Sequence, residues 1–143
     1  MGVMVCSKKG EKSIDLGGGG FLNLRQKVAE LCSPEFGEHY KTVSNGLFLY
    51  GKDREIFYKD FDAKTLKLVE EKKVHIKVVD FCLQSDVEGQ IRYGACKVIY
   101  EHIKDYYDDI LYGYCGRPDC AKFADFKAIV EECIDLKCDL VWR

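Results

Sequence analysis

The sequence has very little proline, with only Pro34 and Pro118 among its 143 residues. This scarcity excludes a proline-rich linker or a low-complexity tail, and we find no internal repeat. The chain also lacks any apolar run near the roughly 20 residues that a membrane-spanning helix needs, so we expect no membrane partner. A chain of this length can bury a core of its own, and we predict a single globular domain over residues 1–143.

The chain also lacks an excess of charge of either sign. It holds 22 basic and 24 acidic residues, for a net charge of −2. A basic surface supplies most of the free energy of non-specific nucleic-acid binding, so we do not expect a nucleic acid as partner. The apolar start Met1–Cys6 is too short for a signal peptide, and no basic residue precedes it. We therefore expect a cytoplasmic protein.

Cysteine, in contrast, is plentiful, with eight residues. Without an export signal, reduced thiols that behave as small apolar residues are the expected state. Cys115, Cys120, Cys133 and Cys138 have a spacing that mimics a four-thiolate zinc site. Cys133, however, falls on the apolar face of the last predicted helix, where a core thiol is expected. We predict no metal and no cofactor, and the zinc alternative at these four cysteines stays open.

The hydrophobic periodicity predicts an α+β fold. We expect a hairpin over 1–16, an apolar strand-like segment over 47–50 and a closing strand over 138–143. Helices are expected over 21–32, from Ser33-Pro34, over 62–83 with a bend near Lys73, over 94–107 and from Asp119. The simplest assembly is a small antiparallel sheet, formed by the N- and C-terminal strands and covered on one face by four to five helices.

The run Gly17–Gly20, between a strand and a helix, is the sharpest motif. Backbone N–H groups of Gly18, Gly19 and Gly20 could approach a phosphate there, helped by the helix dipole, and Arg25 lies one turn further on. No Lys-Ser/Thr pair follows, so this is not a P-loop, and the dinucleotide pattern is incomplete. The alternative is a permissive corner between sheet and helix. Both interpretations stay open.

Tyrosines gather in the glycine-rich segment that follows the fourth predicted helix. Tyr112 and Tyr114 lie close in sequence to Arg117. Tyrosine and arginine are enriched at the residues that dominate protein–protein binding energies. We predict that these three contact a partner protein, with packing between helix ends as the alternative.

No catalytic signature is found. Nucleophilic catalysis needs a thiol or hydroxyl beside an oriented base. None of the three histidines, His39, His75 and His102, stands in such a pattern with a cysteine or serine. The protein is therefore predicted to be a non-enzymatic one.

Three segments carry a resemblance. Ser13–Leu31, Ser85–Gly89 and Tyr114–Cys120 resemble small uncharacterised proteins of phages and gut bacteria. That family has no known activity, and the resemblance implies a phage or mobile-element origin, where small binders and inhibitors of host defences are common. Our leading hypothesis is a binding protein that inhibits or sequesters a bacterial host target by protein–protein contact. The alternative is a nucleotide- or phosphate-binding protein that uses Gly17–Gly20.

Overall fold

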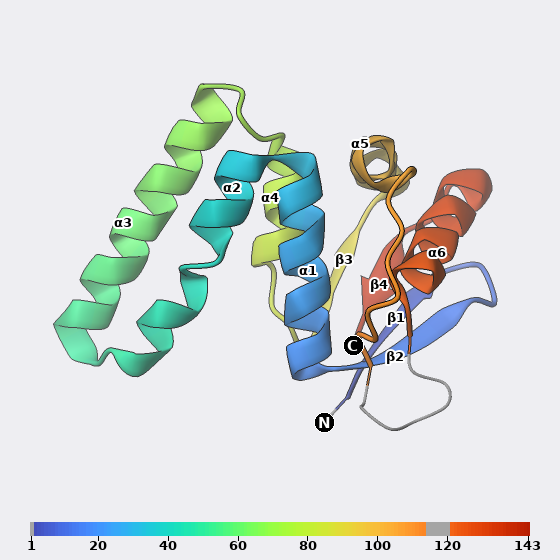
Figure 1. Ribbon diagram of the computed structural model, residues 1–143, viewed down its shortest axis with the longest axis horizontal. Helices are drawn as coiled ribbons and strands as arrows, with labels where there is room; N and C mark the ends of the chain where they lie inside the picture. The colour runs from blue at the N-terminus through green and yellow to red at the C-terminus, as the bar shows by residue number, and fades with distance from the viewer. Residues whose placement is uncertain (1, 114–120) are drawn as a thin grey trace.

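The computed structural model describes residues 2–113 and 121–143. Figure 1 shows the sheet at one side of the molecule and one long helix at the other, with further helices between them. In chain order the elements are β1 (Gly2–Ser7), β2 (Ser13–Gly17), α1 (Gly18–Cys32), α2 (Pro34–Tyr40), the 3-10 helix η1 (Val43–Phe48), α3 (Gly51–Glu70), α4 (Ile76–Leu83), β3 (Gly89–Ile91), α5 (Tyr93–Ile103), α6 (Phe123–Leu136) and β4 (Leu140–Trp142).

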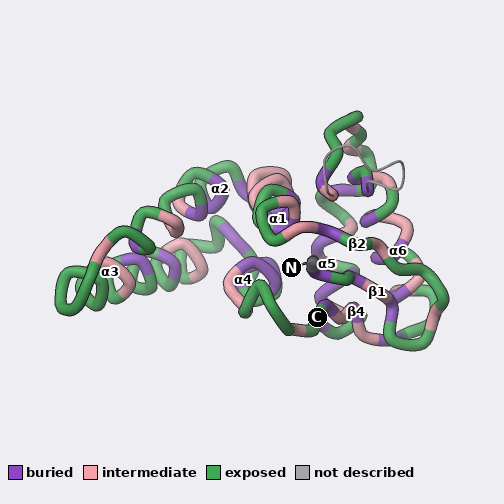
Figure 2. The backbone as a smooth tube through the Cα atoms, turned by 90° about the horizontal axis from the view of Figure 1, so that it is seen from below, coloured by how far each residue is buried: buried purple, intermediate pink, exposed green. Residues whose placement is uncertain are grey.

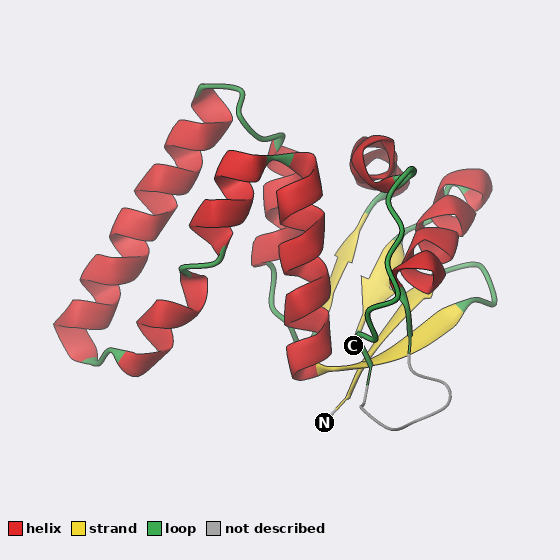
Figure 3. Cartoon of the chain, in the orientation of Figure 1, coloured by secondary structure: helices red, strands yellow, loops and turns green. Residues whose placement is uncertain are grey.

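The four strands form one antiparallel sheet in the order β2-β1-β4-β3. Strand β1 alternates as a half-buried strand should, with Val3 and Val5 buried and Met4 exposed. Helices α1 and α6 contact β1. Figure 3 shows the helices in red and the strands of the sheet in yellow. The predicted α+β class, with a small antiparallel sheet of N- and C-terminal strands, is confirmed.

Aromatic side chains form the centre of the core. The rings of Phe21, Phe81 and Trp142 contact one another at centroid distances of 5.6–6.3 Å, in tilted or edge-on geometry. Phe126 of α6 extends this cluster from Phe81, at 5.9 Å. Because α1, α4, α6 and β4 each contribute a ring, the cluster joins segments from both ends of the chain.

Strand β3 was not predicted from the sequence. It pairs with β4 on one side, Gln90 lying opposite Val141. On its other side β3 bonds to the Gln84 side chain instead of to another strand. The Gln84 amide donates to the Gln90 carbonyl at 2.8 Å and accepts from the Gln90 N–H at 3.1 Å. Three residues give too little alternation to be recognised.

The segment around residue 50 also differs from expectation. The predicted strand over 47–50 is wrong, because η1 includes Leu47 and Phe48, and the extended Leu49 and Tyr50 belong to no strand of the described sheet. Helix α3 begins at Gly51, eleven residues before the predicted start at Asp62. Gly51 has a φ of +55°, which turns the chain sharply at the start of the helix. The single helix predicted over 62–83 is two helices, α3 and α4, separated by a turn in which Lys72 is left-handed (φ 58°).

Elements η1 and α3 form what we call the arm, and the sheet with α1, α2, α4, α5 and α6 forms the body. Figure 2 shows the arm extending away from the body, with exposed residues along much of α3. Only Phe61 and Thr65 of α3 are buried. Both meet His39 of α2: the His39 and Phe61 rings stack at 4.0 Å, and His39 Nε2 lies 2.8 Å from Thr65 Oγ1. The arm is thus attached to the body mainly through α2.

Within the described residues, no helix combines the length and apolar character needed to cross a bilayer.

Candidate protein-contact surface

The corner between η1 and α3 exposes large apolar side chains. The exposed fractions of Leu47, Phe48 and Tyr50 are 61%, 81% and 86%. We call these three residues the arm tip. Ile56, in the second turn of α3, is 66% exposed. Isolated exposed apolar residues are ordinary, whereas three of them within four positions, two of them aromatic, make this corner a candidate contact surface.

The backbone explains why these side chains point outward. Gly46 is buried beneath Phe57 and Tyr58, so close that a Cβ at this position would clash with both rings. The side of η1 that faces α3 is therefore filled by backbone, and Leu47 and Phe48 lie outside it. Tyr50 has an extended backbone and precedes the left-handed Gly51, so it lies before the first turn of α3, outside the helix.

The charges beside the arm tip balance. The first turn of α3 carries Lys52, Asp53, Arg54 and Glu55, two residues of each sign, and all four are exposed. Such a surface provides no net field to attract a polyanion or an anionic membrane. Its apolar side chains are the feature that a partner would recognise.

The glycines of the predicted phosphate site differ in how closely other residues pack against them. Gly18, Gly19 and Gly20 form the first turn of α1, and Gly17, the N-cap residue, supplies no side-chain cap. A Cβ at Gly20 would overlap the carbonyl oxygen of Tyr112, so glycine is required there for close backbone packing. Nothing lies within 4 Å of the Cβ positions of Gly18 and Gly19. Gly20 thus has the role of a corner residue, while phosphate binding at Gly18 and Gly19 remains a prediction.

Arg25 is not at the glycine turn. Its side chain is buried, with 3% exposed, and its guanidinium donates to the carbonyls of Cys82, Gln84 and Ser85 at 2.7–3.0 Å. The guanidinium also lies over the Phe21 ring, 4.2 Å from its centroid. Burial lowers the pKa of Arg25. The expectation that Arg25 would face a ligand is corrected: its donors hold the turn after α4 against α1.

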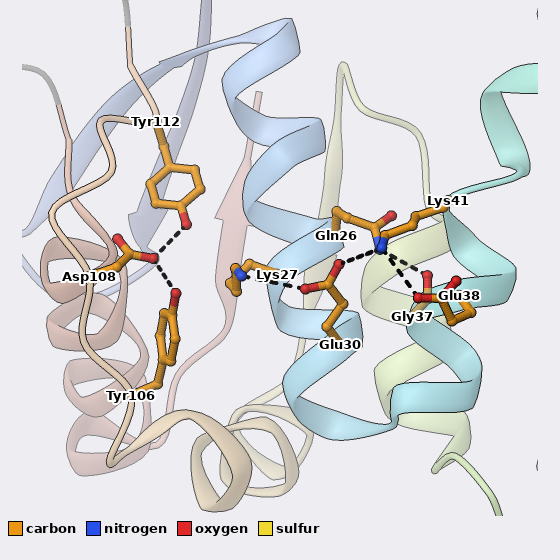
Figure 4. A network of polar contacts seen from close by, with 9 residues as sticks. All are labelled: Gln26, Lys27, Glu30, Gly37, Glu38, Lys41, Tyr106, Asp108 and Tyr112. Carbon is orange, nitrogen blue, oxygen red and sulfur yellow. Dashed lines mark hydrogen bonds and ion pairs between the residues drawn. The ribbon is translucent and has the colours of Figure 1, made fainter.

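Of the predicted tyrosine site, Tyr112 is buried and belongs to the core. Its hydroxyl donates to Asp108 at 3.0 Å, and Tyr106 donates to the same carboxylate oxygen at 2.5 Å (Figure 4). Burial, followed by the hydrogen bond to Asp108, raises the pKa of Tyr112. Tyr112 therefore fastens its own segment and offers no exposed contact. Tyr114 and Arg117 lie outside the described residues.

The polar contacts of Figure 4 continue from α1 to α2. Glu30 is paired with Lys27 at 3.4 Å and with Lys41 at 3.5 Å, and Gln26 donates to the Gly37 carbonyl at 2.8 Å. Gly37 itself packs so closely on Glu30 that a Cβ would clash with it. This network fixes α2, and with it the base of the arm, to α1.

The cysteines form no metal site in the described part of the chain. Cys133 and Cys138 are buried and free, and no group of three or more ligating side chains is found there. Cys115 and Cys120 lie outside the described residues, so the zinc alternative stays untested. Burial raises the pKa of the Cys32 thiol to about 12, which keeps it protonated at neutral pH although it borders a hollow with His75 and His102.

The arm tip was missed in the sequence, although a signal was present. Leu47–Tyr50 is an apolar run, and we interpreted it as a strand or a buried extended segment. The flanking Gly46 and Gly51 were visible, but the packing of Gly46 under two α3 rings was not. An apolar run between glycines that starts a charged helix is the pattern that could have identified the tip.

Comparisons with protein-family models, with curated proteins and with solved structures find no match for this chain. Its function must therefore be argued from its own residues.

Proposed function

We propose that this is a non-enzymatic binding protein that acts by protein–protein contact, and that the arm tip is its contact surface. The observation that carries the proposal is the exposure of Phe48 and Tyr50, at 81% and 86%. Fully burying one such side chain is worth about 1.5–3 kcal/mol. The fold gains none of this from these two residues, so it is available for association.

The form of the tip favours a concave partner. Side chains so exposed project from the molecule, and two projecting tips would bury far less than the roughly 1,200 Å² of a stable dimer interface. The balanced charges of Lys52–Glu55 give no preference for a nucleic acid or an anionic lipid surface. The partner that fits is a protein with an apolar pocket that accepts Phe48 and Tyr50.

The surroundings of His39, His75 and the Cys32 thiol favour binding over catalysis. His39 Nε2 lies within hydrogen-bond distance of the Phe61 carbonyl and the Thr65 hydroxyl. His75 caps α4, because its Nδ1 accepts the Lys77 N–H at 3.1 Å. The Cys32 thiol stays protonated, so it lacks the thiolate that a nucleophile needs.

The resemblance to phage and gut-bacterial proteins directs the search for the partner to bacterial lysates. The wild type and the double variant Phe48→Ser/Tyr50→Ser would be compared as baits. Val87→Ser is the matched control, because Val87 is 62% exposed and lies far from the arm in sequence. A partner held by the wild type and the control, but not by the double variant, supports the proposal.

The purified pair would then be measured by calorimetry. Truncation of an interface aromatic that dominates binding costs about 2 kcal/mol or more, so each single variant should weaken binding by about 30-fold. Equal affinity of the wild type and the double variant would contradict the arm tip. If the partner is an enzyme, loss of its activity on adding this protein, but not the double variant, would identify an inhibitor.

A further inference from the structure

A basic hollow lies where the arm rejoins the body. It has a volume of about 480 Å³ and is lined by the end of α1, the last turn of α3, the connection to α4, and α5. These elements meet near the upper edge of Figure 1. Lys72, Lys73, His75 and His102 line it, and none of its lining residues is acidic. Four basic side chains around a space free of carboxylates form an electropositive site in a protein whose net charge is −2.

The side-chain donors that line this hollow, and the backbone N–H of Ile76, have no hydrogen-bond acceptor among the described residues. None of the ion pairs between described residues includes Lys72 or Lys73. His75 accepts a hydrogen bond at Nδ1 from Lys77, which leaves its Nε2 for another partner. Ile76 begins α4 and lines the hollow, and no hydrogen bond between described residues uses its N–H. A helix N-terminus adds a positive partial charge to the lysines.

A purely structural explanation competes with a ligand site. Helices α1, α3 and α5 end at this hollow, and basic residues near helix C-termini are stabilising on their own. The C-terminus of α6 provides a reference. Lys137 follows that helix with a φ of 51°, as Lys72 follows α3 with a φ of 58°. The N–H of the next residue bonds back five residues in both cases, from Lys73 to Leu68 and from Cys138 to Cys133. The two turns share one geometry, but Lys137 does not line this hollow.

We propose that the hollow binds a small phosphate-bearing anion, through Lys72, Lys73, His75 and the N–H of Ile76. The site is separate from the arm tip and goes beyond the proposed protein contact. A phosphate dianion suits it because its oxygens accept several hydrogen bonds at once, while two lysines balance its charge. The volume exceeds what inorganic phosphate needs, and Val69 and Ile76 offer apolar surface to an organic group.

The test uses the two left-handed lysines as a matched pair. Lys72→Gly and Lys137→Gly each remove one positive charge and relieve a left-handed backbone. Binding of inorganic phosphate and of a nucleoside monophosphate would be followed by NMR chemical shifts at constant ionic strength, up to about 20 mM, a range suited to millimolar affinities. We expect shifts at the Ile76 amide, and an affinity about three- to fivefold weaker in Lys72→Gly but unchanged in Lys137→Gly.

The outcomes are distinct. A nucleotide that binds where phosphate does not shows that the apolar lining contributes, and equal binding shows that the phosphate alone is recognised; both support the site. Saturable shifts absent from Ile76, no binding of either compound, or equal weakening by both lysine variants would overturn it. The double variant Lys72→Gly/Lys73→Gln should weaken binding by about tenfold or more. The arm-tip variant Phe48→Ser/Tyr50→Ser should bind phosphate normally, so the two proposals can fail independently.

Discussion

The body and the arm use their apolar residues in opposite ways. In the body, Phe21, Phe81 and Trp142 are buried against one another. In the arm, Phe48 and Tyr50 are almost fully exposed, and α3 buries only Phe61 and Thr65. Because stability follows burial, the body should account for most of the free energy of unfolding. The exposed apolar residues of the arm add little to that energy, which is why we assign them to recognition.

Two arginines, one in the body and one in the arm, give the largest expected difference in the free energy of unfolding. Arg25→Met leaves the carbonyls of Cys82 and Gln84 without their buried donor, while the Ser85 carbonyl keeps only the Trp142 indole N–H at 2.8 Å. We expect a loss of about 3 kcal/mol in the free energy of unfolding. Arg54→Met, on the exposed first turn of α3, should change it by less than about 0.5 kcal/mol. Urea denaturation followed by circular dichroism measures both.

If Arg25→Met does not fold, Arg25→Lys preserves the charge and some donors, and should fall between the wild type and the methionine variant. Equal, small losses for the Arg25 and Arg54 variants would show that the buried guanidinium contributes little to the body.

Two adjacent glycines sharpen the contrast within the body itself. Gly20→Ala places a Cβ on the Tyr112 carbonyl, so we expect destabilisation of about 2–3 kcal/mol as that segment is displaced. Gly19→Ala meets no atom and improves helix propensity, and should stabilise the protein by about 0.5–1 kcal/mol. Thermal melts of both variants suffice. A Gly19→Ala variant that is destabilised would contradict the open surroundings of this position.

The smallest expected effect is the pH dependence of the joint between arm and body. Burial is the largest cause that lowers the pKa of His39, so the folded protein favours the neutral ring that stacks on Phe61. The stability contributed by neutral His39 is complete above the unfolded pKa of about 6.5, and is lost as the pH falls from there toward the lowered folded pKa. The protection factors of α3 amides, which are exchange rates corrected for the intrinsic pH dependence, should therefore fall between pH 7.5 and 5 by more than those of α1.

His39→Gln is the control for this effect. It removes the titrating ring, while the exposed His75 and His102 remain in both proteins and cancel in the comparison. The variant should lose the extra pH dependence of α3. A wild-type profile in which α1 and α3 respond alike would indicate that the arm has no separate opening.

Local patterns were sufficient to predict much of the body, but not β3 or the separation of α4 from α3. The hairpin at the N-terminus and the closing strand around Trp142 follow from alternation, and α1 follows from its apolar stripe. The sequence could not indicate that Arg25 would bond to carbonyls nearly 60 residues away. The short β3 was missed for a related reason, since its pairing with β4 is a long-range contact.

The arm was the less predictable region, because packing decided it. Leu47–Tyr50 has the composition of a strand, yet no strand lies beside it to pair with, and the close contact of Gly46 with Phe57 and Tyr58 favours a 3-10 turn instead. The candidate site went unpredicted for the same reason. Exposure is a property of the whole fold, and an apolar run read alone is normally assigned to the core.

The hollow beside Lys72 has a consequence for how the chain is built. Cys32 ends α1 and Ile76 begins α4, and both residues line the hollow. The chain between them, through α2 and the arm, therefore starts and ends at the same place. Because those ends lie together, we expect a change of length within η1 and α3 to leave the strands and the helices that cover them in place. Helix α2 does not share this tolerance, because Phe36 and Tyr40 pack in the core.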